Sequence, residues 1–145
     1  MGDDCAQSNA GHARLSPMPL SFCIIDDEEE VCDVLRLYFE SRGHRCHVAH
    51  DGETGIALVR QHQPAAVFLD VQMPRMNGYE VLNRLRADGA TRAIPVMLMT
   101  ALTKESGTGD TDWAKSAGAD LFLAKPFELD DLLAAVEKLT GVRIT

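Results

Sequence analysis

Five polar residues with chemically useful side chains stand at the ends of short apolar runs. Asp26 and Asp27 follow the run SFCII, and Asp70 ends the run AAVFLD. Thr100 ends the run IPVMLMT, and Lys125 ends the run ADLFLAK. Ligands of open α/β sheets bind beyond the carboxyl ends of the strands. If these runs are neighbouring parallel strands, three carboxylates, a hydroxyl and an ammonium group meet there.

Three converging carboxylates need compensation. A like-charge pair at ~4 Å costs on the order of 4 kcal/mol at an effective dielectric constant of about 20. Oxygen ligands of this kind suit a hard cation such as Mg²⁺. An aspartate can also act as a nucleophile and form an acyl phosphate, while Lys125 and Thr100 could hold the phosphoryl oxygens. The set therefore indicates phosphoryl transfer onto a carboxylate.

The apolar runs alternate with segments of helical periodicity, which predicts βαβ units and one parallel sheet covered on both faces. We expect strands at 21–25, 44–49, 65–70, 94–100 and 119–125. We expect helices from the acidic residues after Asp27 to Gly43, then at 51–63, 79–87 and 112–117, and finally from Leu129 to Leu139. Gly78, which follows Asn77, is expected to provide a turn with positive φ.

Composition excludes several classes of protein. A formal net charge of −8 argues against non-specific nucleic-acid binding, which needs a basic surface. No apolar run approaches the roughly 18 residues that span a bilayer, and the acidic N-terminus does not read as a signal peptide. The four cysteines form no CxxC pair. We therefore expect a cytoplasmic protein without direct nucleic-acid or membrane binding.

The sequence resembles the receiver domain of two-component response regulators, in particular the chemotaxis-regulator-like members. The resemblance rests on IIDDEEEV, FLDVQMPRMNGYEVLNRLR, IPVMLMTA and AGADLFLAKPFELDDLL, and it covers roughly residues 20–140. It implies a flavodoxin-like, doubly wound α/β fold with five parallel strands in the order 2-1-3-4-5 and five helices. The expected organisation is a flexible extension at 1–20, a receiver domain at 21–141 and a tail at 142–145.

The resemblance also implies a metal site. Asp70 takes the position of the phosphoacceptor and also ligates Mg²⁺ or Mn²⁺. Asp27 takes the position of a direct metal ligand, and Asp26 holds the metal through water. The backbone carbonyl of Gln72 would complete the protein ligands.

The remaining site residues that the resemblance implies act on the phosphoryl group. Thr100 matches the switch hydroxyl, and Lys125 matches the phosphate-binding lysine. The Lys125–Pro126 peptide bond is expected to be cis, and Phe122 stands at the position of the switch aromatic residue. The segment from Thr100 to Lys125 is about three residues longer than is usual in the family, which puts the usual output surface in doubt.

The favoured function is that of a stand-alone phosphoacceptor that catalyses its own phosphorylation and dephosphorylation and is not otherwise an enzyme. Its expected partners are a histidine kinase or histidine phosphotransfer protein and a downstream protein, and it is expected to be a monomer or weak dimer. One alternative is a receiver fragment of a longer response regulator or hybrid kinase. Another is an aspartyl-phosphate phosphohydrolase, which would require an acid where this chain has Gln72.

Overall fold

The computed structural model describes residues 19–100 and 118–142, and these form five strands and four helices. The strands are β2 (Ser21–Ile25), β3 (Arg45–Ala49), β4 (Ala66–Asp70), β5 (Val96–Thr100) and β6 (Leu121–Ala124). The helices are α1 (Glu29–Ser41), α2 (Gly52–His62), α3 (Gly78–Ala87) and α6 (Leu129–Thr140). The predicted helix at 112–117 lies outside the described residues, as do residues 1–18 and 143–145.

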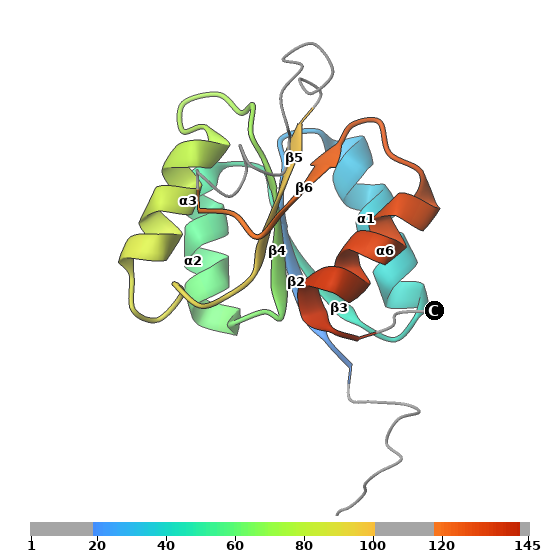
Figure 1. Ribbon diagram of the computed structural model, residues 1–145. Coiled ribbons are helices and arrows are strands. Elements are labelled where there is room, and N and C mark those ends of the chain that lie inside the picture. The colour runs from blue at the N-terminus through green and yellow to red at the C-terminus, as the bar shows by residue number, and fades with distance from the viewer. Residues whose placement is uncertain (1–18, 101–117, 143–145) are drawn as a thin grey trace, which may run out of the picture.

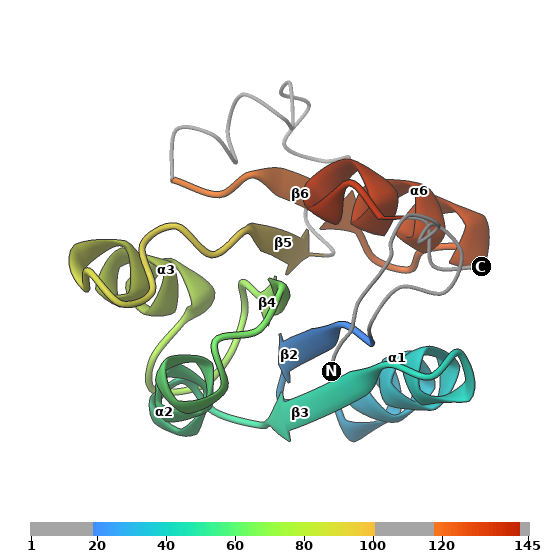
Figure 2. The same ribbon diagram turned by 90° about the horizontal axis from the view of Figure 1, so that it is seen from below.

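All five strands are parallel and lie in the order β3-β2-β4-β5-β6. Numbered along the chain, this is the order 2-1-3-4-5, so the predicted sheet is confirmed. Helices α2 and α3 cover one face and α1 and α6 cover the other (Figures 1 and 2). Among the described residues, no helix combines the length and the apolar character needed to cross a bilayer.

The three central strands β2, β4 and β5 are buried on both faces, which explains why they read as continuous apolar runs. Every residue of β4 and β5 is buried. Side chains that alternate along each strand enter two separate cores. On the α1 and α6 side, the rings of Phe22 and Phe39 lie 4.5 Å apart, and those of Phe39 and Phe68 stack at 5.6 Å. On the α2 and α3 side, Leu69 and Leu98 belong to the second core.

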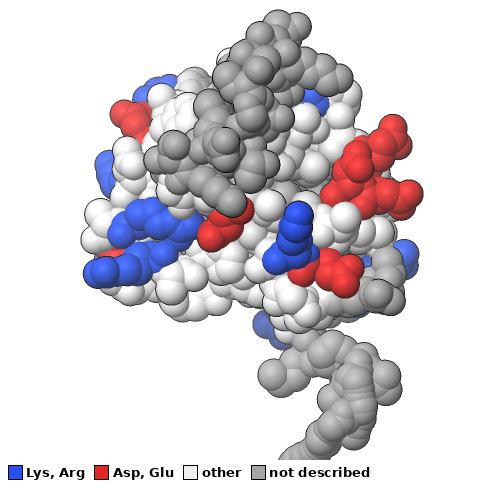
Figure 3. Space-filling view, in the orientation of Figure 1, with Lys and Arg blue, Asp and Glu red and all other residues white. Residues whose placement is uncertain are grey.

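Charged side chains of both signs are mixed across the face of the molecule that Figure 3 shows. On the part of that face that the structure describes, no continuous basic surface is visible (Figure 3).

Gly78 is required for a reason that the sequence did not suggest. Its φ is not in the left-handed region, so the expected positive-φ turn is wrong. Instead, a Cβ at position 78 would clash with the carbonyl oxygen of Asp70 and would lie 2.8 Å from the Cα of Val71. The Gly78 N–H donates to the Val71 carbonyl at 2.9 Å. The absence of a side chain therefore lets the start of α3 pack against the end of β4, next to Asp70.

We expect Gly78→Ala to lower the free energy of unfolding by roughly 1–3 kcal/mol, because the added methyl group meets backbone atoms that cannot rotate away. The matched control is Gly89→Ala, whose Cβ would meet nothing closer than Arg92 Nη2 at 3.8 Å. Urea unfolding of the two variants checks the difference. Equal stability losses would show that the close approach at Gly78 is not the cause.

Candidate functional site

The side chains singled out in the sequence meet at the carboxyl edge of the sheet. Asp26 directly follows β2, Asp70 and Thr100 are the last residues of β4 and β5, and Lys125 directly follows β6. Asp26, Asp70 and Thr100 are buried, with exposed fractions of 0%, 4% and 1%. Asp27 is exposed at the rim. Since these strands are adjacent and parallel, their ends necessarily share one edge.

Three carboxylates form a compact cluster at this edge. Asp26, Asp27 and Asp70 each offer an oxygen, and these oxygens all lie within 4.8 Å of one another. The donor set consists of oxygen atoms on negatively charged groups, which is what Mg²⁺ and Mn²⁺ prefer. The three residues therefore fit a divalent metal ion. The role predicted for the Gln72 carbonyl stays a prediction, although the Gln72 N–H donates to Asp70 Oδ1 at 3.4 Å.

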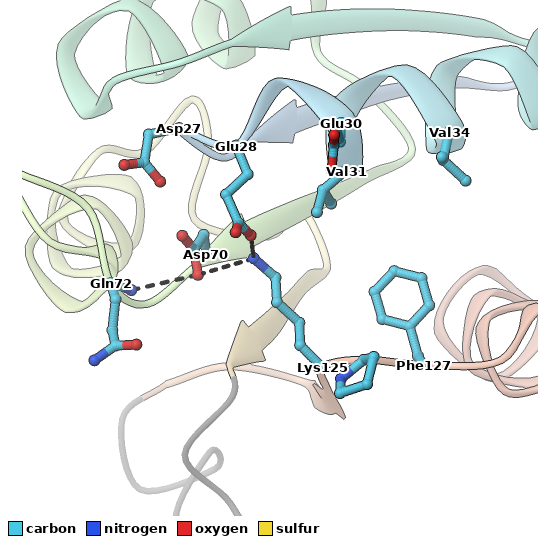
Figure 4. A pocket seen from close by; sticks show the side chains of 10 residues that line it. Asp27, Glu28, Glu30, Val31, Val34, Asp70, Gln72, Lys125 and Phe127 are labelled. Atoms are coloured by element: carbon cyan, nitrogen blue, oxygen red, sulfur yellow. Dashed lines mark hydrogen bonds and ion pairs between the residues drawn. The ribbon is translucent and has the colours of Figure 1, made fainter.

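In the part of the chain that the structure describes, Lys125 is the cation that faces this cluster (Figure 4). Its Nζ lies 2.8 Å from Asp26 Oδ2, 2.8 Å from Glu28 Oε1 and 3.5 Å from Asp70 Oδ1. The backbone N–H of Lys125 donates to the Thr100 carbonyl at 2.8 Å, which ties it to the end of β5. The Lys125–Pro126 peptide bond is cis.

The electrostatics of the site follow from burial and from an excess of negative charge. Burial, and then the charge of Asp26, raise the pKa of Asp70 to about 6, against the opposing effect of Lys125. Burial alone would lower the pKa of Lys125, but its hydrogen bonds to Asp26 and Glu28 outweigh this effect and raise it. Lys125 therefore stays charged. The pKa of Asp70 is raised to about 6, so its carboxyl group ionises closer to neutral pH than an ordinary aspartate does.

The backbone around Asp26 is held from several directions. Its N–H donates to the Ala49 carbonyl at 3.1 Å, and its Oδ1 accepts from the Glu28 N–H at 2.9 Å. Its own carbonyl oxygen lies 3.1 Å from His50 Nδ1 and 3.4 Å from Cys32 Sγ. These contacts fix the direction in which the acidic pair leaves β2.

A pocket of about 640 Å³ lies beside Asp70 and Lys125. Its acidic lining residues Asp27, Glu28 and Glu30 lie just before and at the start of α1 (Figure 4). The rest is lined by Asp70, Lys125 and Gln72 and by the apolar residues Val31, Val34, Pro126 and Phe127 (Figure 4). A small phosphorylated molecule, or one side chain of a partner protein, fits a space of this size.

Phe122 takes a position that differs from that of the other predicted site residues. It lies in β6 opposite Leu98, is partly buried, and packs against the core on the α2 and α3 side. It is therefore part of the sheet that supports the site and is not among the residues that line the pocket. The longer segment at 101–112 lies outside the described residues.

Glu28 is the site residue that sequence reasoning missed. In the sequence it is one of several acids at the start of α1, where the helix dipole favours them. The structure shows its carboxylate on Lys125, 97 residues further along the chain. The available signal was its place directly after the Asp26–Asp27 pair, at the carboxyl end of a strand.

Known proteins are similar in sequence to this chain. Residues 22–137 match the model of the response regulator receiver domain. The DNA-binding dual master transcriptional regulator RpaA of Synechocystis sp. is 38% identical over 116 residues, which is 80% of this chain and 47% of RpaA. Protein PilH of Pseudomonas aeruginosa is 37% identical over 113 residues, which is 78% of this chain and 91% of PilH. The chain thus spans about half the length of the first such relatives and most of PilH.

A solved structure shares the fold. The receiver domain of the sensor histidine kinase PA1611 from Pseudomonas aeruginosa has a TM-score of 0.73, with 22% identity, over 86% of this chain and 99% of that chain. In that structure a magnesium ion is coordinated in the active-site cleft. The match to the receiver-domain model covers residues 22–137, and the sheet order and the acidic edge are those that the resemblance implied. The chain therefore belongs to the response regulator receiver domain family.

Proposed function

We propose that Asp70 accepts a phosphoryl group from a histidine kinase or a histidine phosphotransfer protein. The observation that carries this proposal is the position of Asp70. Its buried carboxylate lies 3.5 Å from Lys125 Nζ, belongs to the three-carboxylate cluster and lines the pocket. An Asp70 oxygen attacks the phosphorus atom, the bond from phosphorus to the donor's nitrogen breaks, and the electron pair leaves with that nitrogen.

The neighbouring side chains prepare Asp70 for this attack. With a pKa of about 6, its carboxylate is mostly ionised at neutral pH and remains more basic than an ordinary aspartate. Lys125 lies close enough to bind a phosphoryl oxygen, and Thr100 ends the adjacent strand. We assign to Thr100 the hydroxyl that follows the phosphoryl group, and to Phe122 the aromatic residue that moves with it. The chain thereby catalyses its own phosphorylation and dephosphorylation.

The metal site is proposed to consist of Asp26, Asp27, Asp70 and the Gln72 carbonyl, with Asp26 acting through water. When bound there, Mg²⁺ or Mn²⁺ neutralises phosphoryl oxygens and the excess of carboxylate charge. The fit of the donor set supports this assignment, as does the magnesium ion in the structure of the PA1611 receiver domain.

The output is proposed to be a change in a protein-binding surface. A phosphoryl group adds about −1.5 to −2 charges, and the conformation that binds it better becomes more populated. We assign this surface to the receiver domain itself, which spans residues 22–137 of the chain. The phosphohydrolase alternative is disfavoured because Gln72 cannot act as the required acid.

Incubation with Mg²⁺ and acetyl phosphate is expected to add one phosphoryl group to the chain, detected by mass spectrometry and lost on treatment with hydroxylamine. Asp70→Asn should abolish this mass gain, because an amide does not form an acyl phosphate. The matched control is Asp33→Asn, at an exposed position on α1 whose carboxylate pairs with Arg36. Labelling of Asp70→Asn at the yield of the control would contradict the assignment.

Without a metal ion, Asp70→Asn is expected to be more stable than the wild type at pH 7 by on the order of 1–3 kcal/mol. The pKa of Asp70 is 3.8 ordinarily and about 6 in the folded chain. The folded state therefore binds this proton more tightly than the unfolded chain, and stability falls as pH rises through this interval. The advantage of the variant should be absent below pH 3.8 and complete above pH 6.

Urea unfolding at several pH values, with and without Mg²⁺, measures this difference. Mg²⁺ should stabilise the wild type, because a ligand that binds only the folded state stabilises it. It should therefore reduce the difference in unfolding free energy between the wild type and Asp70→Asn. Asp33→Asn serves again as the control for charge removal at the surface. A wild type that becomes more stable relative to Asp70→Asn between pH 4 and pH 7 without Mg²⁺ would refute the assigned pKa direction.

A further inference from the structure

Glu28 occupies an unusual position for the residue that caps a helix. It is the N-cap of α1, yet its side chain makes no capping hydrogen bond. Its Oε1 instead accepts a hydrogen bond from Lys125 Nζ at 2.8 Å, a distance equal to that between Lys125 and Asp26. Figure 4 shows the side chain extending from the start of α1 toward Lys125, close to Asp70.

Because of this contact, the Glu28 carboxylate lies beside the space next to Asp70 and Lys125 that a phosphodonor would enter. The same nitrogen of Lys125 lies 2.8 Å from Glu28 and 3.5 Å from Asp70. A phosphoryl group attacked by Asp70 therefore comes within a few ångströms of the Glu28 carboxylate. Its oxygens also compete with that carboxylate for Lys125, since both are anionic acceptors of the same N–H groups.

Glu28 differs from the other carboxylates of the site in its freedom to move. Its side chain is 60% exposed, whereas that of Asp26 is 0% exposed. An exposed ion pair is weak and easily broken, so Glu28 can release Lys125 without disturbing the core. Its charge nevertheless stays at the rim of the pocket, next to Asp27 and Glu30.

We propose that Glu28 determines the phosphodonor preference of this receiver, by discriminating against donors that carry more negative charge. This inference rests on the proposed role of Asp70 as the phosphoacceptor. The repulsion between the Glu28 carboxylate and an approaching donor grows with the charge of that donor. Donors whose leaving group is a protonated nitrogen, as in a phosphoramidate, are consequently favoured over acyl phosphates.

The two small donors acetyl phosphate and phosphoramidate separate this effect from general reactivity. With either donor, a bond forms between an Asp70 oxygen and phosphorus. With acetyl phosphate the P–O bond breaks, and acetate leaves with the electron pair. With phosphoramidate, whose nitrogen is already protonated near neutral pH, the P–N bond breaks and ammonia leaves. Acetyl phosphate carries the greater negative charge, so the removal of Glu28 should help it more.

The test compares Glu28→Gln with Glu29→Gln in the presence of Mg²⁺. Glu29 is the adjacent acid, is exposed, and is not among the residues that line the pocket. Glu28→Gln is expected to raise the rate constant for acetyl phosphate by roughly threefold to tenfold and that for phosphoramidate by clearly less. Glu29→Gln should leave both within about twofold of the wild type, because its charge is outside the pocket.

An equilibrium measurement provides a second readout that involves no leaving group. Beryllofluoride binds an aspartate as an analogue of the phosphoryl group, and its affinity can be followed by ¹⁹F NMR. Glu28→Gln should bind it more tightly than Glu29→Gln does, by roughly threefold or more, because Lys125 is then not held by a competing carboxylate.

The proposal is overturned if the ratio of the two rate constants is the same in Glu28→Gln and the wild type, or if Glu29→Gln changes the ratio equally. Those results leave Asp70 phosphorylated, so they affect only the role of Glu28. Failure of the wild type to be labelled at Asp70 by either donor would instead refute the proposed function. The two failures are therefore distinguishable in one set of measurements.

Discussion

The excess of negative charge at the carboxyl edge of the sheet is the constraint on which the rest of the structure depends. Asp26 is fully buried and Asp70 nearly so, and buried carboxylates are costly unless a cation or hydrogen bonds compensate for them. Lys125 supplies the compensation from a position 99 residues away from Asp26. Only a fold that brings the ends of β2, β4 and β6 to one edge can form this contact.

The parallel sheet meets this requirement because all its strands end on the same side, and its apolar faces hold the edge in place. The burial of β4 and β5 on both faces leaves little freedom for Asp70 and Thr100 to move apart. Gly78 allows α3 to begin directly against Asp70. The bonds to Asp26 from neighbouring backbone groups fix the other side of the cluster. The packing of the core therefore determines the geometry of the site.

The sequence predicts which residues end the strands, but it does not predict how closely individual side chains and backbone segments approach one another. Runs such as AAVFLD that end in a polar residue mark strand ends locally, so the sheet and the meeting of Asp26, Asp70 and Lys125 could be foreseen. The role of Gly78 could not, because it depends on how closely two backbone segments approach, and the local signal favoured a positive φ instead. Glu28 was missed for a different reason: an acid at the start of a helix already has a local explanation in the helix dipole, so nothing in the helical pattern distinguishes the one whose side chain reaches Lys125.

The compensation at the edge is incomplete, and this incompleteness is what makes the site useful. Among the described residues, one ammonium group, that of Lys125, pairs with the carboxylates of Asp26, Asp70 and Glu28, so these four residues carry a surplus of negative charge. A second lysine would remove the surplus and stabilise the fold, but it would also weaken the attraction for a divalent cation. Burial raises the pKa of Asp70, and the neighbouring charge of Asp26 raises it further. Repulsion among these carboxylates thus lowers the stability of the metal-free fold and, for the same reason, favours the binding of a divalent metal ion.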